Sequence, residues 1–253
     1  MSVSIVLPAG SAAGSPEHRS SPLRHILTWV IYRLRILTPL VRFLLHQFQF
    51  VLLSWYRKPA DMQMLRKIYR ERRPLLQPLE SFNILDLARA QALLDGDMAE
   101  VGVYQGSSAR LICSAKGSRS FWGFDTFTGL ADVSEKDTHQ GVRFFRPGHF
   151  RSDYDSTLKY LDEFQNVQLV KGYFPQSAGA AVERKFSFVH LDVDTYSSTL
   201  ASMRFFWPRL VEGGLMMTHD SHADGVAQAI AEFTAESGAR AISSACSQVI
   251  VLK

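Results

Sequence analysis

The sequence contains few of the features that mark secreted or cysteine-dependent proteins. It holds 2 cysteines in 253 residues, Cys113 and Cys246, and no CxxC or Cys/His spacing. Neither a disulfide framework nor a zinc site is indicated, and the low cysteine content fits a reducing compartment. Cys113 ends an apolar helical run, which favours a small buried residue over a reactive thiol.

The chain also lacks an uncharged apolar run long enough to span a membrane, which needs about 20 residues. Its most apolar stretch, residues 23–56, is interrupted by Arg33, Arg35 and Arg42. Residues 1–22 do not resemble a secretory signal, because no charged segment precedes their short apolar part. Their Ser, Ala, Gly and Pro content predicts a disordered tail.

Acidic residues are scarce near the N-terminus. Residues 1–75 contain 12 Lys/Arg and 3 Asp/Glu, a net charge of +9, whereas residues 76–253 carry −5. Residues 23–60 therefore form a basic amphipathic helical arm, with Trp29, Trp55 and Tyr56 as interfacial aromatics. Two interpretations of this arm are open: contact with a membrane surface through residues 23–58, or packing on the body or on a second copy in a homo-oligomer. A nucleic-acid-binding fold is not indicated, because the positive charge is confined to the arm.

From residue 98 short apolar strands alternate with helical stretches up to a final strand pair in residues 240–253. The 46% hydrophobic share is sufficient for a full core. This alternation predicts an α/β domain over residues 61–253 with a doubly wound, mostly parallel sheet, preceded by an N-terminal helical extension. In such sheets ligands bind beyond the carboxyl ends of the strands.

The expected dinucleotide motif G-x-G-x-x-G is missing at the end of the first strand. The turn instead carries Glu100, Gly102, Gly106 and Ser107 in a G-x-x-x-G pattern. Glycines allow close approach of a ligand, and the helix start offers free N–H donors. Because Glu100 would repel a pyrophosphate but attract a cation, the turn suits S-adenosylmethionine better than NAD, although an ordinary tight turn explains it as well.

The next two strands end in candidate contacts for a nucleoside. Asp125 follows the second strand, where an acid accepts hydrogen bonds from ribose hydroxyls in nucleoside-binding folds. A helix-capping aspartate is the alternative. The third strand ends in a glycine between aromatics, Gly172 and Phe174, which could border an adenine ring or form a simple turn.

Strands four and five end in acidic residues and histidine. Asp192 and Asp194 follow one strand, and His219 and Asp220 follow the other. Two crowded carboxylates resist burial unless a positive charge lies beside them. Oxygen-rich ligands with one imidazole suit a divalent ion, so these four residues predict a site for magnesium, with manganese as the alternative.

Five motifs resemble, in order and spacing, the macrocin O-methyltransferase (TylF-like) family over about residues 62–253. They are "VGVYQGSSA", "FDTFTGL", "VKGYF", "VHLDVDTYSST" and "RLVEGGLMMTHDSHADGVAQAIAEF". The resemblance implies a seven-stranded class I methyltransferase fold that binds S-adenosylmethionine and, typically, magnesium. It implies methylation of a sugar hydroxyl on a small molecule or glycan.

The resemblance also assigns roles to the residues. The methionine part of the cofactor would lie against Glu100, Gly102, Gly106 and Ser107, its ribose against Asp125, and its adenine near Gly172 and Phe174. Asp192 would be the general base or a metal ligand, with Asp194 in the complementary role. The acidic pair that family members carry after strand five falls on His219 and Asp220.

Three positions depart from the family pattern. His219 replaces the first acid of that pair, Ser221 stands where a tyrosine often follows the pair, and Ser197 stands where glutamate is common. Either the imidazole is a metal ligand, which shifts the preference from magnesium towards manganese, iron or zinc, or His219 is the base and no metal is needed. A catalytically altered, cofactor-binding scaffold in an assembly complex is the alternative function. An NAD-dependent oxidoreductase is disfavoured by the missing dinucleotide motif.

Residues 131–152 predict a lid whose Arg143, Arg146 and His149 would recognise an anionic glycan, or a solvated loop with the same charges. Because the cofactor is made in the cytoplasm, we expect a cytoplasmic enzyme, held through its arm at the inner face of the membrane.

Overall fold

The computed structural model describes residues 38–253 apart from residues 140 and 144. Between Phe48 and Gln49 the structure divides into two units, and the second comprises residues 49–253. Helix α2 (Thr38–Ser54) crosses this boundary. The predicted tail, residues 1–22, and the first part of the predicted arm, residues 23–37, lie outside the described residues.

The second unit is built on one seven-stranded sheet with the order β5-β2-β1-β6-β7-β9-β8. The strands are β1 (Asp97–Val101), β2 (Phe121–Asp125), β5 (Val167–Lys171), β6 (Phe186–Leu191), β7 (Leu210–Thr218), β8 (Arg240–Ser243) and β9 (Val249–Leu252). The pairs from β5 to β7 are parallel, and β9 is antiparallel to both β7 and β8. The predicted doubly wound, mostly parallel sheet is confirmed.

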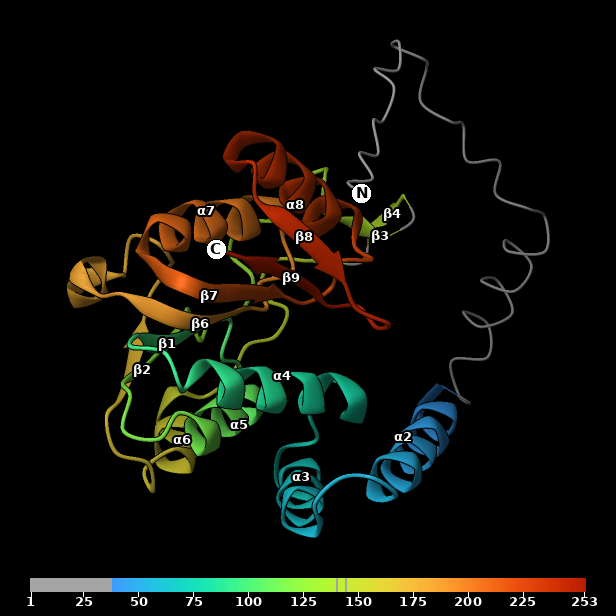
Figure 1. The fold of residues 1–253 in the computed structure, drawn as a ribbon. Helices are drawn as coiled ribbons and strands as arrows, with labels where there is room; N and C mark the ends of the chain where they lie inside the picture. The colour runs from blue at the N-terminus through green and yellow to red at the C-terminus, as the bar shows by residue number, and fades with distance from the viewer. Residues whose placement is uncertain (1–37, 140, 144) are drawn as a thin grey trace, which may run out of the picture. The chain divides into compact units, whose positions relative to one another are not determined.

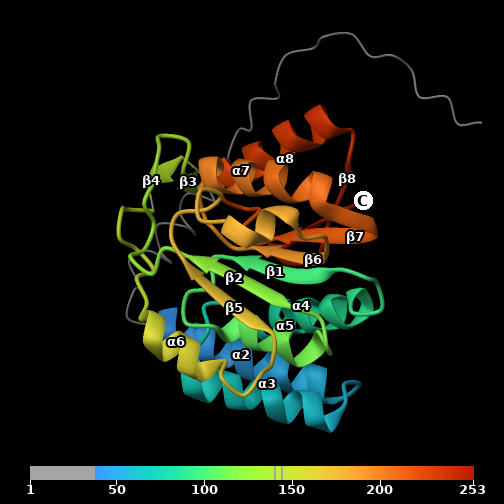
Figure 2. The ribbon, with the colours of Figure 1, turned by 90° about the vertical axis from the view of Figure 1, so that its left-hand side faces the viewer.

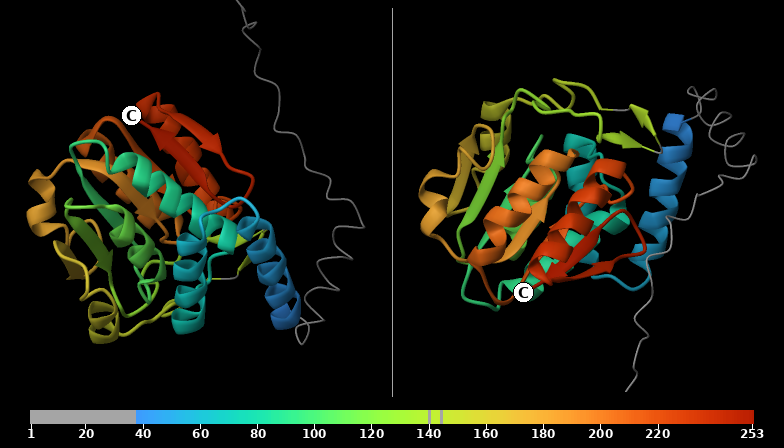
Figure 3. Two further views of the ribbon diagram at one scale, coloured as in Figure 1. Left: turned by 60° about the horizontal axis from the view of Figure 1, so that its bottom comes forward. Right: turned by 90° about the horizontal axis from the view of Figure 1, so that it is seen from above.

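Helices cover both faces of this sheet. One face carries α3 (Pro59–Arg72), α4 (Pro78–Gln91), α5 (Ser107–Ala115) and α6 (Tyr154–Tyr160), and the other carries α7 (Tyr196–Phe206) and α8 (Asp224–Ser237). Figure 1 shows these two layers below and above the strands, and Figure 2 shows them from the side. Seen from above, α7 and α8 run side by side across the sheet (Figure 3).

Each layer has its own apolar core. Phe174, Phe186 and Phe206 pack with α7 and α8 on one side of the sheet, and Phe82, Phe121 and Phe188 pack with α3, α4 and α5 on the other. Strand β6 is buried at every position, as expected for a central parallel strand covered on both faces. Its carboxyl end is therefore held rigidly at the edge where ligands bind.

The helical region that follows the arm is interrupted once. Arg73 adopts a left-handed backbone conformation (φ 47°) at the end of α3, and Pro74 cannot continue a helix. Helix α4 then begins with Pro78 at its first turn and a capping box in which Gln77 and Glu80 bond reciprocally. This places Glu80 at the buried start of α4.

The predicted lid contains a short hairpin that the sequence analysis does not predict. Strands β3 (Thr138–His139) and β4 (Val142–Arg143) pair antiparallel. Asp224, at the start of α8, accepts hydrogen bonds from Thr138 Oγ1 (2.6 Å) and from the backbone N–H of Gly141 (3.0 Å). The hairpin is thereby fixed beside the carboxyl edge of the sheet.

Candidate active site

A cavity of about 510 Å³ opens beyond the carboxyl ends of the parallel strands. Its lining comes from the turn after β1, the ends of β2 and β5, the loops after β6 and β7, and the lid. The predicted site residues on this lining are Gly102, Ser107, Asp125, Gly172, Phe174, Asp192, Asp194, His219 and Asp220. Glu100 and Gly106 are not among the lining residues.

The turn after β1 is shaped by backbone that only glycine accommodates. Gly102 has φ +91°, and a Cβ there would lie 1.8 Å from the carbonyl oxygen of Asp192. Gly106 has φ +81° at the N-terminal cap of α5, so it shapes the turn from outside the cavity. The close crossing of the two loops brings the start of α5, with Ser107, next to the end of β6.

Glu100 lies below the cavity rather than on its surface. Its side chain is completely buried and lies 2.7 Å, Oε1 to Nδ1, from the equally buried His190 on the neighbouring strand β6. Burial raises the pKa of Glu100, and the histidine opposes this shift. Direct contact with the methionine part of a cofactor therefore stays a prediction for Glu100. The sequence analysis missed His190, because a histidine inside a strand carries no signal of its partner.

Asp125 lies at the carboxyl end of β2 with its carboxylate on the cavity. Oδ2 accepts from the backbone N–H of Tyr104 and Oδ1 from that of Phe127, both at 2.7 Å. Burial raises the pKa of Asp125, and these hydrogen bonds oppose the rise. Val103 is a third backbone donor to this carboxylate. Since a carboxylate has about four accepting positions, capacity for a ligand hydroxyl remains.

The segment after β5 provides an aromatic wall of the cavity. Phe174 is buried and stacks on Phe206 with ring centroids 5.2 Å apart, and it also contacts Phe124 and Phe205. Gly172 allows the chain to pass close to Ser177, because a Cβ there would lie 2.7 Å from Cβ of Ser177. This side of the cavity suits a flat apolar ring.

The acidic residues and the histidine that follow β6 and β7 converge as predicted. Asp192, His219 and Asp220 each present one ligand atom, and these atoms lie within 4.8 Å of one another. Parallel pairing of β6 with β7 brings this about, because Leu191 lies opposite Thr218 and the next residues follow side by side. Asp194 is not part of this three-residue group, although its carboxyl hydrogen-bonds to that of Asp220.

The imidazole of His219 lies among carboxylates. Nδ1 is 3.3 Å from Oδ1 of Asp192 and 3.1 Å from Oδ2 of Asp220. Burial alone would lower the pKa of His219, but the charge of Asp192 and the contacts with the surrounding carboxylates raise this pKa well above its usual range. Without another cation, the ring carries a proton at neutral pH and is the positive charge that the crowded aspartates require.

Asp194 and Asp220 show how strongly negative this centre is. Burial and the charges of Asp192 and Asp220 raise the pKa of Asp194 well above its usual range. Burial also pushes the pKa of Asp220 upwards, but His219 outweighs it and lowers the pKa to about 2. Asp194 (φ 62°) and Asp220 (φ 53°) both adopt the left-handed backbone region, which costs energy for residues other than glycine.

The centre fits a divalent cation. Two carboxylates and one imidazole converge, and Nδ1 of His219 is a buried nitrogen without a well-aligned hydrogen bond among the described residues. An ion could take the place of the proton on Nδ1, and the excess negative charge favours such an exchange. The mixed nitrogen and oxygen donor set is compatible with manganese as well as magnesium.

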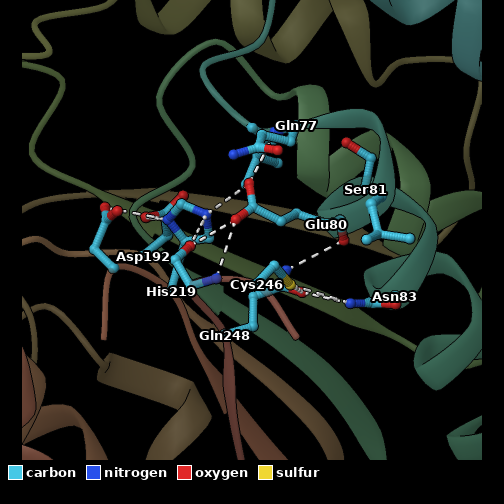
Figure 4. A network of polar contacts seen from close by, with 12 residues as sticks. Gln77, Glu80, Ser81, Asn83, Asp192, His219, Cys246 and Gln248 are labelled. Carbon is cyan, nitrogen blue, oxygen red and sulfur yellow. Dashed lines mark hydrogen bonds and ion pairs between the residues drawn. The ribbon is translucent and has the colours of Figure 1, made fainter. Parts of the chain in front are cut away.

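Glu80 joins this centre from the far side of the imidazole, and the sequence analysis missed it. Its side chain is 3% exposed, and Oε2 lies 3.2 Å from Nε2 of His219. Burial pushes the pKa of Glu80 upwards, but the hydrogen bond and charge of His219 outweigh it and lower the pKa to about 2. The sequence does carry the Gln77–Glu80 capping pattern, but that pattern predicts only a helix start. Figure 4 shows Glu80 and Asp192 on opposite sides of the ring.

The lid lines the cavity with aromatic and imidazole groups rather than with its arginines. His139, Phe145 and Phe150 lie on the lining, together with His222 from the loop after β7. The rings of His139 and His222 meet edge to face with centroids 5.0 Å apart. Arg143, Arg146 and His149 are not lining residues. Recognition of an anionic glycan through these three residues therefore gains no support from the cavity.

Known proteins share both the sequence pattern and the fold. The family profile described as macrocin-O-methyltransferase (TylF) matches residues 77–249. An 8-demethyl-8-(2,3-dimethoxy-alpha-L-rhamnosyl)-tetracenomycin-C 4'-O-methyltransferase from Streptomyces olivaceus is 26% identical over 158 residues, which cover 56% of this chain and 59% of that relative. The match thus spans less than two thirds of the relative's length.

Two solved structures illustrate the likeness of fold. The calicheamicin methyltransferase CalS11 is 18% identical with a TM-score of 0.59, over 96% of this chain and 99% of that one. An O-methyltransferase from Bacillus cereus in complex with SAH is 14% identical with a TM-score of 0.52, over 78% and 93% of the two chains. These likenesses confirm the predicted class I methyltransferase fold. Since the family profile covers well over half of the chain, the protein belongs to the macrocin O-methyltransferase (TylF) family.

Proposed function

We propose that this protein is an S-adenosylmethionine-dependent O-methyltransferase that acts on a sugar hydroxyl of a glycosylated small molecule or glycan. One observation carries the proposal: the carboxylate of Asp125 and the Asp192–His219–Asp220 centre line the same cavity. A cofactor whose ribose is held at Asp125 can thus reach the centre. Family membership and the rhamnosyl methyltransferase relative support this activity.

Some residues of the cavity bind the cofactor, and Asp192 transfers the proton. Asp125 holds the cofactor ribose, Ser107 and the turn at Gly102 lie along its methionine part, and Phe174 lies against its adenine. Asp192 takes the proton of the acceptor hydroxyl. The oxygen attacks the sulfonium methyl carbon in line, the carbon–sulfur bond breaks, and its electron pair stays on sulfur to give S-adenosylhomocysteine.

The same centre would hold a divalent ion, magnesium or manganese, through Asp192, His219 and Asp220. Such an ion, when bound, lowers the pKa of a coordinated hydroxyl and orients it. Asp194 supports this arrangement by hydrogen bonding to Asp220. The raised pKa of His219 argues against the alternative in which His219 is the base, because a ring already protonated at neutral pH accepts no further proton.

The lining of the acceptor side suits a glycoside with an apolar part. Phe145 and Phe150 offer apolar surface, and His139 and His222 offer hydrogen-bonding groups for hydroxyls. Sugars commonly present such mixed faces, with C–H groups on one side and hydroxyls around the rim. We infer that the acceptor is bound under the lid mainly by stacking and neutral hydrogen bonds.

The activity is tested by incubating the protein with S-adenosylmethionine, Mn²⁺ or Mg²⁺ and a panel of rhamnosides and other glycosides. Mass spectrometry should detect a product that has gained one methyl group. Calorimetry with S-adenosylmethionine and with NAD should show binding of the first only. Cofactor binding without any methylated product would favour the scaffold function, and binding of NAD instead would overturn the proposal.

We further propose that α2 attaches the protein to anionic membranes. Residues Leu44, Phe48, Val51 and Trp55 recur at helical spacing and are all more than half exposed, Trp55 by 88%. The helix contains Arg42 and no Asp or Glu, and Lys58 follows it, whereas Arg57 is paired with Asp86. Each basic residue near an anionic surface contributes about 1 kcal/mol of attraction, and apolar burial adds to it. Among the described residues no helix is long and apolar enough to cross a membrane.

Co-sedimentation with phosphatidylglycerol-containing vesicles tests this attachment. The Val51→Ser/Trp55→Ser double variant should lose vesicle binding, while Leu93→Ser, at a leucine that is 86% exposed outside α2, should not. Substitution is preferable to removing residues 1–60, because Phe50 and Leu53 belong to the core. If full-length protein ignores the vesicles and the double variant instead changes oligomer size in light scattering, the stripe is a subunit interface.

A further inference from the structure

The carboxylate of Glu80 has more partners than a helix cap requires. In a capping box the glutamate accepts only from the backbone N–H of the cap residue, here Gln77 N to Oε2 at 2.8 Å. Oε1 additionally accepts from Ser247 Oγ at 2.6 Å, and Oε2 lies 3.2 Å from Nε2 of His219. Burying a carboxylate is costly unless both of its oxygens have partners. The contacts of Glu80 therefore stabilise its buried charge.

The contacts around Nε2 determine which ring nitrogen of His219 carries a proton. Because Ser247 Oγ gives its hydrogen to Glu80, it presents a lone pair to Nε2, from which it is 3.1 Å distant. Glu80 Oε2 is the other neighbour of Nε2 and is also an acceptor. Nδ1 also has carboxylate oxygens nearby, but none of them is aligned for a hydrogen bond, whereas Nε2 has the aligned contact with Ser247. This geometry favours Nε2 as the protonated nitrogen of the neutral ring. The lone pair of the neutral ring is then on Nδ1.

Nδ1 is the nitrogen that faces the reaction centre, 3.3 Å from Asp192 and 3.1 Å from Asp220. We propose that Glu80 is a positioning residue: together with Ser247 it holds His219 with Nε2 protonated, so that Nδ1 is presented to the methyl-transfer centre. The proposal rests on the proposed function, since it takes this centre as the site of reaction. A carboxylate behind a ligating histidine fixes the tautomer and ring orientation and raises the basicity of the ligating nitrogen.

The support for the ring comes from rigid parts of the fold. Glu80 sits in the first turn of α4, and its backbone carbonyl accepts from Gln248 Nε2 at 3.1 Å. One turn further on, Asn83 donates to Gln248 Oε1 at 2.9 Å (Figure 4). The start of α4 is thereby tied to the segment before β9, and the acceptors behind His219 cannot shift independently.

Glu80→Gln separates positioning from capping. Glutamine also closes a capping box, so α4 should keep its start. Its amide oxygen would stay on Gln77 N, and its NH₂ group would face Ser247. The serine hydroxyl would then be free to donate to Nε2, which permits the other tautomer. Asn83→Ala is the matched control, because it loosens the same helix–segment contact without touching His219.

Two measurements on the full-length protein decide the proposal. The ¹⁵N NMR spectrum is recorded after the pH has been raised until the His219 ring is neutral, and its signals are assigned by comparison with His219→Gln. The wild-type protein and Asn83→Ala should then show Nε2–H, and Glu80→Gln should show a mixture of the two tautomers. In calorimetry with Mn²⁺, Glu80→Gln should bind about 10–100-fold more weakly, Asn83→Ala within about twofold of wild type, and both should bind S-adenosylhomocysteine normally.

The outcomes separate this proposal from the proposed function. Wild-type His219 protonated on Nδ1, or an unchanged tautomer in Glu80→Gln, overturns the role of Glu80. If the wild type binds no Mn²⁺, the metal part of the proposed function fails, and the tautomer measurement alone still decides the role of Glu80. If Glu80→Gln unfolds, the wild-type spectrum still shows which nitrogen carries the proton. Ser247→Ala then takes the place of Glu80→Gln, and it should shift the tautomer equilibrium by a smaller amount.

Discussion

Replacing Asp125 with alanine should weaken cofactor binding more than replacing Asp192. Asp125 lines the cavity, and its carboxylate accepts from the backbone N–H groups of Tyr104 and Phe127 at 2.7 Å and also from that of Val103. A carboxylate has about four accepting positions, so capacity for one ligand hydroxyl remains. Hydrogen bonds to a charged group contribute roughly 1.5–3 kcal/mol. Loss of one such bond to the ribose corresponds to about a tenfold to hundredfold loss of affinity.

Isothermal calorimetry with S-adenosylhomocysteine measures this difference directly. Asp192 lies at the reacting end, so Asp192→Ala should change the affinity by less than about threefold. Because Asp125 also organises the turns at Tyr104 and Phe127, the unfolding temperature of each variant without ligand is the control for general damage. Equal losses in the two variants, at similar stability, would refute the ribose assignment.

Three further predictions concern the centre and the turn beneath it. Excess chelator should abolish methyl transfer, and Asp220→Ala should do so with the unfolding temperature preserved; undiminished turnover in chelator would count against the metal. His219→Asp should move the preference from manganese towards magnesium, because it gives an all-oxygen site; an unchanged metal profile would argue that His219 is no ligand. Gly102→Ala should lower the free energy of unfolding by about 2–4 kcal/mol, since its Cβ would meet the Asp192 carbonyl at 1.8 Å; urea denaturation that matches wild type would show that the crossing is looser.

Much of the fold could be predicted because the relevant signals are local. Each apolar strand and amphipathic helix carries its own periodicity, and parallel sheets obey strict rules of connection. Asp192, His219 and Asp220 could be grouped because the ends of neighbouring parallel strands meet at one edge. The five family motifs supported the same arrangement, and the family profile confirms the family to which they point.

What could not be predicted depends on contacts between distant segments. Glu80 contacts His219 because α4 packs against the segment before β9, and no local sequence pattern predicts that contact. Glu100 lies beneath the cavity and contacts His190 on the neighbouring strand β6, a contact between two strands that the sequence does not reveal. The lid hairpin was missed because its strands have two residues each, too few to show alternation.

The most direct test of the account measures chemistry and binding on the same variant. With labelled S-adenosylmethionine held at saturation and a glycoside acceptor, the rate of methyl transfer should fall by about 10²–10⁴-fold in Asp192→Ala, the typical contribution of a general base. The affinity for S-adenosylhomocysteine should stay within about threefold of wild type. Transfer at the wild-type rate in Asp192→Ala would contradict the assignment of the Asp192–His219–Asp220 centre as the site of methyl transfer.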